Sequence, residues 1–176
     1  LGGFFGLVVI AVVALAIVLA HTYPCEPAPS IASGTETMKA IRYRCYGSAD
    51  VLEFADVEMP RPATNEVLVS VKAAAVNPLD WHYMRGSPYF LRLGSGIGRP
   101  KDTRLGVDFA GVVAAVGSDV TRFKPGDEVF GGRSGAFAEF VLVPEDRAIA
   151  LKPESVSFEQ AASVPIAALT ALQALR

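Results

Sequence analysis

Cysteine is scarce in this chain of 176 residues, which contains two. Cys25 and Cys45 lie 20 positions apart and form no C-x-x-C pair, so neither a redox motif nor a cysteine-rich metal site is indicated. We interpret them as two unrelated thiols. A disulfide between them would require export to an oxidising compartment.

Charge of either sign is missing from residues 1–20, which read LGGFFGLVVIAVVALAIVLA. An α-helix of this length reaches about 30 Å, the thickness of the hydrocarbon layer of a bilayer. The run is also compatible with a secretory signal, because the small residues Val18 and Ala20 precede His21 as a cleavage site would require. We favour a transmembrane anchor, with a cleaved signal as the alternative and a buried core helix as a poor third.

The first cations after this run are Lys39, Arg42 and Arg44. By the positive-inside rule they favour a membrane-anchored protein whose domain lies in the cytoplasm. If the segment were instead cleaved, the domain would be secreted or periplasmic. Residues 21–37 contain three prolines with Ser, Thr and Gly and no apolar periodicity, so we interpret them as a linker.

A net charge is also lacking from residue 38 onward, where 16 basic residues balance 16 acidic ones. This balance excludes an electrostatic argument for binding nucleic acid or anionic lipid. The partner expected for this part of the chain is a small-molecule substrate, and the oligomeric state cannot be inferred.

Short β-rich runs separated by Gly and Pro turns dominate the chain after the linker. They cover residues 38–46, 51–57, 66–76, 107–116, 127–131 and 137–143. This pattern predicts a mainly β fold, an antiparallel barrel with short helices, over residues 38–156. Helices are expected at 79–85 and at 157–176, where Ser157 is placed to cap the second one.

Four stretches in this region carry a family resemblance. They are EVLVSVKAAAVNPLDWHYMRG (66–86), LGVDFAGVVAAVGSDVTRFKPGDEVFG (105–131), GAFAEFVLVP (135–144) and FEQAASVPIAALTALQAL (158–175). In this order and spacing they resemble the N-terminal GroES-like domain of zinc-free, quinone oxidoreductase-like members of the medium-chain dehydrogenase/reductase superfamily. The resemblance extends over residues 38–176 and implies a GroES-like barrel.

The resemblance also implies that no zinc is bound. Zinc-dependent relatives have a cysteine early and a Gly-His-Glu later, where this chain has Asn77 and Gly106-Val107-Asp108. Asparagine and valine are not useful zinc ligands, so no metal site is expected. A carbonyl substrate must then be activated by hydrogen bonds and a proton donor.

The candidate site residues follow from the same comparison. Asn77 and Asp80, in Val-Asn-Pro-Leu-Asp, match a segment that borders the nicotinamide and the substrate in relatives, and Thr170 matches a hydroxyl near the nicotinamide. Alternatives remain for each: Asn77 as a turn residue, Asp80 as a helix cap, and Thr170 bonded to its own helix backbone. The candidate proton donors are Tyr89, Tyr83 and His82, and packing at the barrel mouth is the alternative for each.

Asp108 is expected to be a buried carboxylate that needs a partner. The segment Gly94-Ser95-Gly96-Ile97-Gly98 is not a dinucleotide motif, because it follows no strand and Arg99-Pro100 stands where a helix should open. The four cations of its loop are interpreted as solvated, with contact to a phosphate of the cofactor or of coenzyme A as the alternative; they are Arg92, Arg99, Lys101 and Arg104.

In the family, residues matching 157–176 begin the connecting helix toward a Rossmann domain, which this chain does not include. NADP(H) would therefore be bound mainly by the missing domain. We expect an N-terminal fragment of an NAD(P)H-dependent, zinc-independent oxidoreductase that reduces a quinone, enone or enoyl-type substrate, and this fragment alone is expected to be inactive. The alternative is a non-catalytic, membrane-tethered GroES-like barrel that acts as a binding module.

Overall fold

The structure is a computed structural model that describes residues 2–176; Leu1, where the predicted anchor begins, lies outside them. The chain forms two compact units. One contains the segments up to Pro29, Tyr43–Leu52 and Trp81–Thr103, and the other contains Ser30–Arg42, Glu53–Asp80 and Arg104–Arg176.

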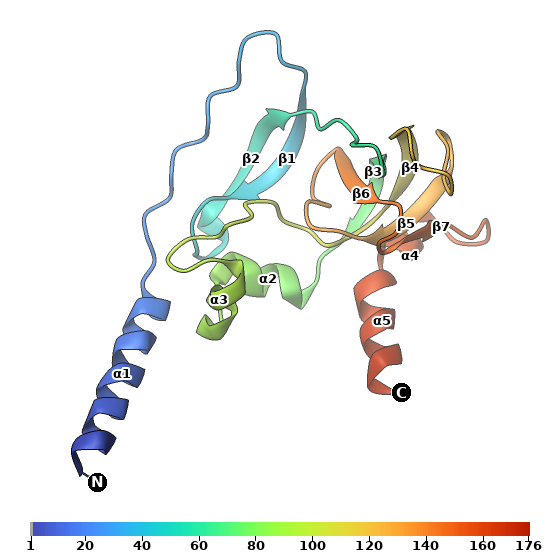
Figure 1. Cartoon of the computed structure of the whole chain (residues 1–176). Helices are drawn as coiled ribbons and strands as arrows, with labels where there is room; N and C mark the ends of the chain where they lie inside the picture. Colours follow the sequence, from blue (N-terminus) through green and yellow to red (C-terminus); the bar gives the residue numbers. More distant parts are fainter. Residues whose placement is uncertain (1) are drawn as a thin grey trace. The chain divides into compact units, whose positions relative to one another are not determined.

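A five-stranded antiparallel sheet forms the centre of the second unit (Figure 1). Its spatial order is β6 (Phe140–Pro144), β3 (Glu66–Ala75), β4 (Asp108–Val116), β5 (Glu128–Gly132) and β7 (Ile149–Leu151). A separate two-stranded sheet pairs β1 (Thr37–Tyr43) with β2 (Leu52–Glu58). The alternating apolar residues of these runs produce the strands, because successive side chains point to opposite faces.

The main hydrophobic core lies on one face of the five-stranded sheet. It consists of Val67, Val69, Phe109, Val113, Phe123, Val129, Ala136, Val141, Val143 and Ile149, all at most 5% exposed. Valine dominates because its branched side chain packs well on a pleated surface. Burying each of the larger side chains contributes about 1.5–3 kcal/mol, so this cluster holds the sheet together.

Two short helices replace the single predicted helix over 157–176. Helix α4 (Phe158–Ala162) begins with a capping box, in which the Ser157 hydroxyl accepts from the Gln160 N–H and the Gln160 side chain accepts from the Ser157 N–H. The predicted cap at Ser157 is therefore confirmed. Helix α5 (Pro165–Ala174) starts at Pro165, because proline lacks the N–H that a continuous helix would use and suits a first helical position.

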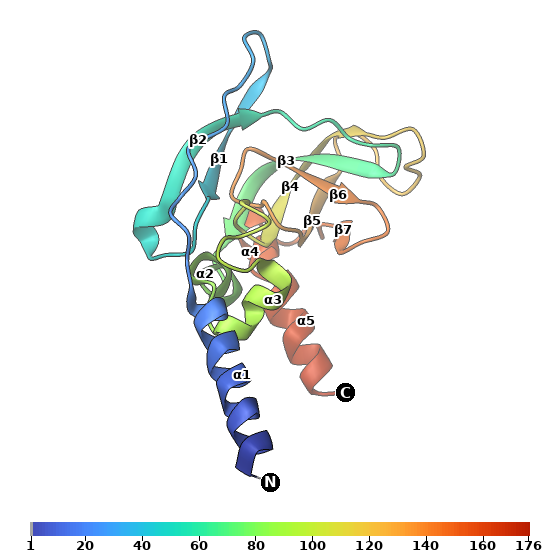
Figure 2. The same ribbon diagram turned by 60° about the vertical axis from the view of Figure 1, so that its left-hand side comes forward.

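The prediction of a mainly β barrel is wrong. Helices α1 to α5 contain about as many residues as the strands, so the fold is mixed. The five-stranded sheet, which Figure 2 shows from a second side, is a half-barrel. Its edge strands β6 and β7 do not pair with each other. Closure requires every edge to be paired, and these two edges are not.

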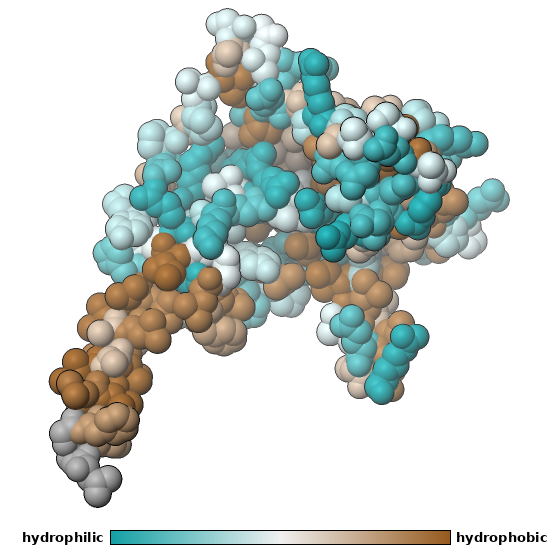
Figure 3. Space-filling model, in the orientation of Figure 1, coloured by the Kyte–Doolittle hydropathy of each residue, from teal (hydrophilic) through white to brown (hydrophobic). Residues whose placement is uncertain are grey.

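Helix α1 (Gly2–Ala20) coincides with the apolar N-terminal run, and hydrophobic side chains cover the face of it seen in Figure 3. At 1.5 Å per residue its 19 residues reach about 28 Å, slightly less than the ~30 Å hydrocarbon layer. Within the described part of the chain, no helix combines the length and apolar character that crossing a membrane requires. The predicted transmembrane anchor at residues 1–20, and the membrane localisation based on it, are therefore wrong.

A disulfide joins Cys25 to Cys45 in the first unit, with 4.6 Å between their Cα atoms. The interpretation of two unrelated thiols is therefore also wrong. The backbone reason is that the chain after α1 runs back along the loop that follows Tyr89: the Tyr23 N–H donates to the Gly98 carbonyl over 2.9 Å. The segment of Cys45 meets the same loop, because the Tyr46 hydroxyl donates to the Gly96 carbonyl over 2.7 Å. Both cysteines thus lie next to one loop, although 20 positions separate them.

Candidate active site

Asn77 lies between the end of strand β3 and helix α2 (Pro78–Arg85). Its side-chain Nδ2 donates to the Ala75 carbonyl over 3.3 Å and to Asp108 Oδ2 over 3.2 Å. Both partners are acceptors, which assigns the nitrogen of the amide to this side and leaves Oδ1 as the group available to a ligand. Asn77 is half-buried, so the amide is held in one orientation while part of it stays accessible.

Asp108 is the first residue of β4 and is fully buried. Besides the Asn77 amide, its carboxylate accepts from the backbone N–H of Ile166, which lies 3.2 Å from each oxygen. Ile166 is in the first turn of α5, where helical N–H groups have no partner within the helix. Asp108 thus has the partners that a buried carboxylate requires, and it connects Asn77 with α5.

Glycine is required just before this carboxylate. Gly106 has a φ of +85°, in the left-handed region that side chains disfavour, and the Phe137 ring occupies the space where a Cβ would stand. Gly106 therefore sets the direction in which Val107 and Asp108 enter the sheet.

Asp80 occupies the third position of α2 and is 3% exposed. Its Oδ2 accepts from the Asn77 backbone N–H over 2.8 Å, so Asp80 makes a helix-capping contact from the third helical position. Asp80 and Asp108 therefore hold Asn77 through two different groups, the backbone N–H and the side-chain amide.

Burial raises the pKa of both carboxyl groups. For Asp80, the loss of hydration outweighs the hydrogen bond from the Asn77 N–H, and the charge of Asp108 raises the pKa further. For Asp108, the loss of hydration outweighs the hydrogen bonds from the Ile166 N–H and the Asn77 amide, so its pKa is raised as well. The second unit thus contains two neighbouring acids whose charged forms are disfavoured.

A pocket of about 390 Å³ lies beside α5 in the same unit. Its lining residues are Val107, Gly132, Arg133, Ser134, Ala148, Pro165, Ile166, Leu169, Thr170 and Gln173. Thr170, the hydroxyl predicted to face a nicotinamide, is therefore at a pocket wall rather than packed in the core. Ile166 also lines the pocket, so the Asp108 contact fixes the start of the helix that forms this wall.

The three candidate proton donors belong to the first unit, with exposed fractions of 37% for Tyr83 and 50% for Tyr89. His82 is half-buried, and its Nδ1 lies 2.6 Å from the Ser87 carbonyl. Because a carbonyl only accepts, this contact assigns the proton to Nδ1 and leaves Nε2 for other partners. The structure therefore divides the predicted site residues: Asn77, Asp80 and Thr170 share the second unit, and the aromatic candidates share the first.

Arg92 is the first residue of helix α3 (Arg92–Ser95), which follows the 3₁₀ helix η2 (Tyr89–Leu91). The interpretation of its loop as solvated is wrong for this residue, which is 3% exposed. Its guanidinium donates to the carbonyls of Leu19, His21 and Gly86 over 3.0, 2.8 and 2.8 Å. A cation at the C-terminal carbonyls of α1 is favourable, and this explains why the arginine is buried.

The Arg92 guanidinium also lies between two aromatic rings, 4.4 Å from the centre of Tyr46 and 4.8 Å from that of Tyr89. Such contacts are attractive because the cation meets the negative face of the ring. Arg92 therefore restricts the position of Tyr89, one of the candidate donors. Sequence reasoning missed this role, since nothing local distinguishes Arg92 from the other cations of the loop.

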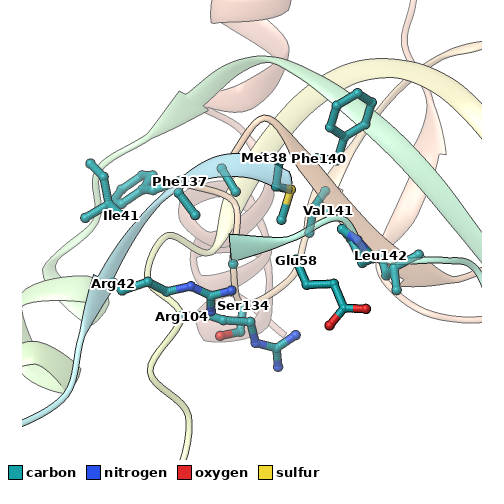
Figure 4. A pocket seen from close by; sticks show the side chains of 14 residues that line it. Met38, Ile41, Arg42, Glu58, Arg104, Ser134, Phe137, Phe140, Val141 and Leu142 are labelled. Atoms are coloured by element: carbon teal, nitrogen blue, oxygen red, sulfur yellow. The ribbon is translucent and has the colours of Figure 1, made fainter. Parts of the chain in front are cut away.

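A smaller pocket of about 90 Å³ lies between β1, β2 and β6 (Figure 4). Arg42 and Arg104, whose backbones form an antiparallel bridge, lie at its edge with Glu58 and Ser134, and Met38, Phe137 and Leu142 are among its apolar lining residues. It contains none of the predicted site residues. Among the described residues, no three His, Cys, Asp or Glu side chains are grouped so as to hold a metal ion.

Several known proteins are similar to this chain. A chloroplastic quinone-oxidoreductase homolog from Spinacia oleracea is 41% identical over 143 residues, which are 78% of this chain and 42% of that protein. A chloroplastic NADPH-dependent alkenal/one oxidoreductase from Arabidopsis thaliana is 39% identical over 155 residues, 82% of this chain and 38% of that protein.

A solved structure of Escherichia coli quinone oxidoreductase in complex with NADPH has the same fold, with a TM-score of 0.67 and 31% identity. The similarity covers 78% of this chain and 40% of that one. The chain thus spans about two fifths of the length of the proteins that it matches.

The family described as the alcohol dehydrogenase GroES-like domain matches residues 63–153. These residues include strands β3 to β7 and the Asn77–Asp108 contact, and they are more than half of the chain. The family resemblance is therefore confirmed, and the chain belongs to the alcohol dehydrogenase GroES-like domain family of the medium-chain dehydrogenases/reductases.

Proposed function

We propose that this chain is the substrate-side domain of a reductase that uses NADPH to reduce a quinone or an enone. The observation that carries the proposal is the Asn77–Asp108–Ile166 network, which orients one amide and fixes the helix beside a pocket. The similar proteins support it, since they are named as quinone and alkenal/one oxidoreductases.

The residues beside α5 fit one end of a dinucleotide. The pocket has an apolar wall, of which Val107 and Leu169 are part, and polar groups from Thr170 and Gln173. A mostly apolar pocket with a few placed polar groups suits a planar ring that carries an amide. Asn77 Oδ1, the free acceptor of the network, suits the amino group of a carboxamide, because Nδ2 is already used by two acceptors.

When bound, NADPH supplies a hydride for the electron-poor carbon of the acceptor. This chain would then supply the proton that completes the reduction, through Tyr89, Tyr83 or His82. His82 has its Nδ1 proton engaged by Ser87, so it donates from Nε2 only as the imidazolium. The tyrosines can donate when neutral, and both residues are exposed.

The proposal includes independence from zinc. Asn77 and Val107 stand where zinc-dependent relatives have metal ligands, and neither side chain binds zinc usefully. Hydrogen bonds must then polarise the acceptor, which gives the oriented donors and acceptors of this site their importance.

We further propose that residues 157–176 lead into a nucleotide-binding domain that holds most of the cofactor. Helix α5 carries the exposed apolar side chains of Leu169 and Leu172, and Leu175, which follows the helix, is exposed as well. Apolar surface of this kind is typical of a face that packs on another domain.

The test is a steady-state assay of the full-length protein that contains this chain. We expect NADPH to be consumed on addition of 1,4-naphthoquinone or but-3-en-2-one, followed by its absorbance. The Asn77→Ala variant should lose activity, and Asn65→Ala is the matched control because Asn65, the chain's other asparagine, is exposed. A folded protein that consumes no NADPH with any quinone or enone would contradict the proposal.

A further inference from the structure

Arg133 follows strand β5 directly and lines the pocket beside α5. Its backbone N–H donates to the Val107 carbonyl over 2.6 Å, which fixes where the side chain begins. The side chain is partly buried, and its Nε is enclosed without a hydrogen-bond partner. A buried donor that lacks a partner is unfavourable, and more so when the group is charged.

Charge in this pocket has one sign. Among the described residues that line it, Arg133 is the one that carries a charge, and the polar neighbours Ser134, Thr170 and Gln173 are neutral. The nearest acid of the site, Asp108, is already engaged by Asn77 and Ile166. The pocket therefore offers a guanidinium cation, with no carboxylate in its lining to neutralise it.

From these observations we infer that Arg133 binds an anionic oxygen of the molecule that occupies this pocket. The inference rests on the proposed function, because that occupant is then the cofactor or the acceptor. The shared chemistry is a phosphate or carboxylate oxygen, which a guanidinium binds through charge-assisted hydrogen bonds. A phosphate would come from NADPH and a carboxylate from an acidic acceptor.

The experiment compares Arg133→Gln with wild type in the full-length protein. Three quantities are measured: the Kd for NADPH by cofactor fluorescence, the KM for neutral 1,4-naphthoquinone, and the KM for a carboxylated naphthoquinone. Arg147→Gln is the matched control, because Arg147 is 71% exposed and lines the neighbouring apolar groove.

A rise of about ten-fold in the Kd for NADPH supports the inference with the cofactor as the source of the anion. A rise confined to the KM for the carboxylated quinone supports it with the acceptor as the source. All three quantities within two-fold of wild type would overturn it. If Arg133→Gln does not fold, the same quantities are measured for Arg133→Lys, which retains the charge but lacks the planar set of donors. A rise of a few-fold in the Kd for NADPH or in the KM for the carboxylated quinone supports the inference. No change in either quantity overturns it.

Failure of this inference is distinguishable from failure of the proposed function. If wild type reduces quinones or enones and Arg133→Gln has the same Kd and KM values as wild type, only the role of Arg133 is contradicted. If wild type reduces no quinone or enone, the proposed function is contradicted, whatever values are measured for the variant.

Discussion

The Asn77 amide donates to the Asp108 carboxylate across 3.2 Å, although 31 positions separate the two residues. This contact joins the end of β3 to the start of β4, two strands that also pair through Ala75 and Asp108. Because the Ile166 N–H binds the same carboxylate, one buried acid fixes both the amide and helix α5.

Loss of the Asn77 amide should weaken both stability and catalysis. We expect Asn77→Ala to lower the free energy of unfolding by about 1–2 kcal/mol, because Asp108 loses one of its hydrogen bonds. The kcat/KM for NADPH-dependent reduction should fall by about ten-fold or more, since an oriented group at the site is removed. Denaturant titration and steady-state kinetics check the two parts. Equal effects in Asn77→Ala and the exposed Asn65→Ala would contradict the account.

The buried acids should make stability depend on pH. The folded-state pKa of Asp108 is raised above its ordinary value of 3.8, so the folded protein holds this proton more tightly than the unfolded chain. The contribution of Asp108 to the free energy of unfolding is fully present below its ordinary pKa of 3.8. This contribution is lost as the pH rises through the folded-state pKa.

Replacement of the acid tests this directly. The Asp108→Asn variant has no carboxyl group at this position, so the pH dependence that Asp108 contributes disappears. The free energy of unfolding of the variant should therefore fall less steeply with rising pH than that of wild type. Denaturant titrations over a series of pH values give both slopes. Parallel slopes in the two proteins would show that burial does not disfavour the charge of Asp108.

Arg92 should contribute strongly to the stability of the first unit. Arg92→Met removes the donors that bind the carbonyls of Leu19, His21 and Gly86, and we expect a loss of roughly 2–4 kcal/mol because these acceptors are then left without a charged partner. Hydrogen exchange should accelerate at the end of α1. Arg99→Met is the control, as Arg99 is more exposed; an equal loss in both variants would argue against a special role for Arg92.

The bridge between Cys25 and Cys45 should stabilise the same unit. A disulfide that closes a loop of this separation, 20 positions, is expected to contribute about 3 kcal/mol, mainly by restricting the unfolded chain. Adding a dithiol reductant should therefore lower the melting temperature of wild type but not that of a Cys25→Ala/Cys45→Ala variant. Wild type that melts at one temperature with and without reductant would refute the expectation.

The strands and the Asn77–Asp80 segment were predictable because their signals are local. Alternating valines indicate β3, and Asp80 three positions after Asn77 indicates a helix cap. The break at Pro165 is also a local signal, although it was not used to divide the last helix.

The features that the sequence did not predict depend on contacts between residues far apart in the chain. In the sequence, Arg92 does not differ from the other cations of its loop. In the structure, it donates to carbonyls about 70 positions earlier in the chain. The partner of Cys45 and the unpaired Nε of Arg133 are likewise set by tertiary structure. The barrel prediction failed for a similar reason, since strand patterns do not reveal whether edge strands meet.

The most direct test of the central claim is binding of NADPH to the full-length protein, followed by cofactor fluorescence, in wild type and in Asn77→Ala. The account predicts saturable binding by wild type and weaker binding by the variant, because the variant lacks the amide that we propose contacts the cofactor. A folded wild-type protein that binds no NADPH would contradict assignment of this GroES-like domain to an NADPH-dependent reductase.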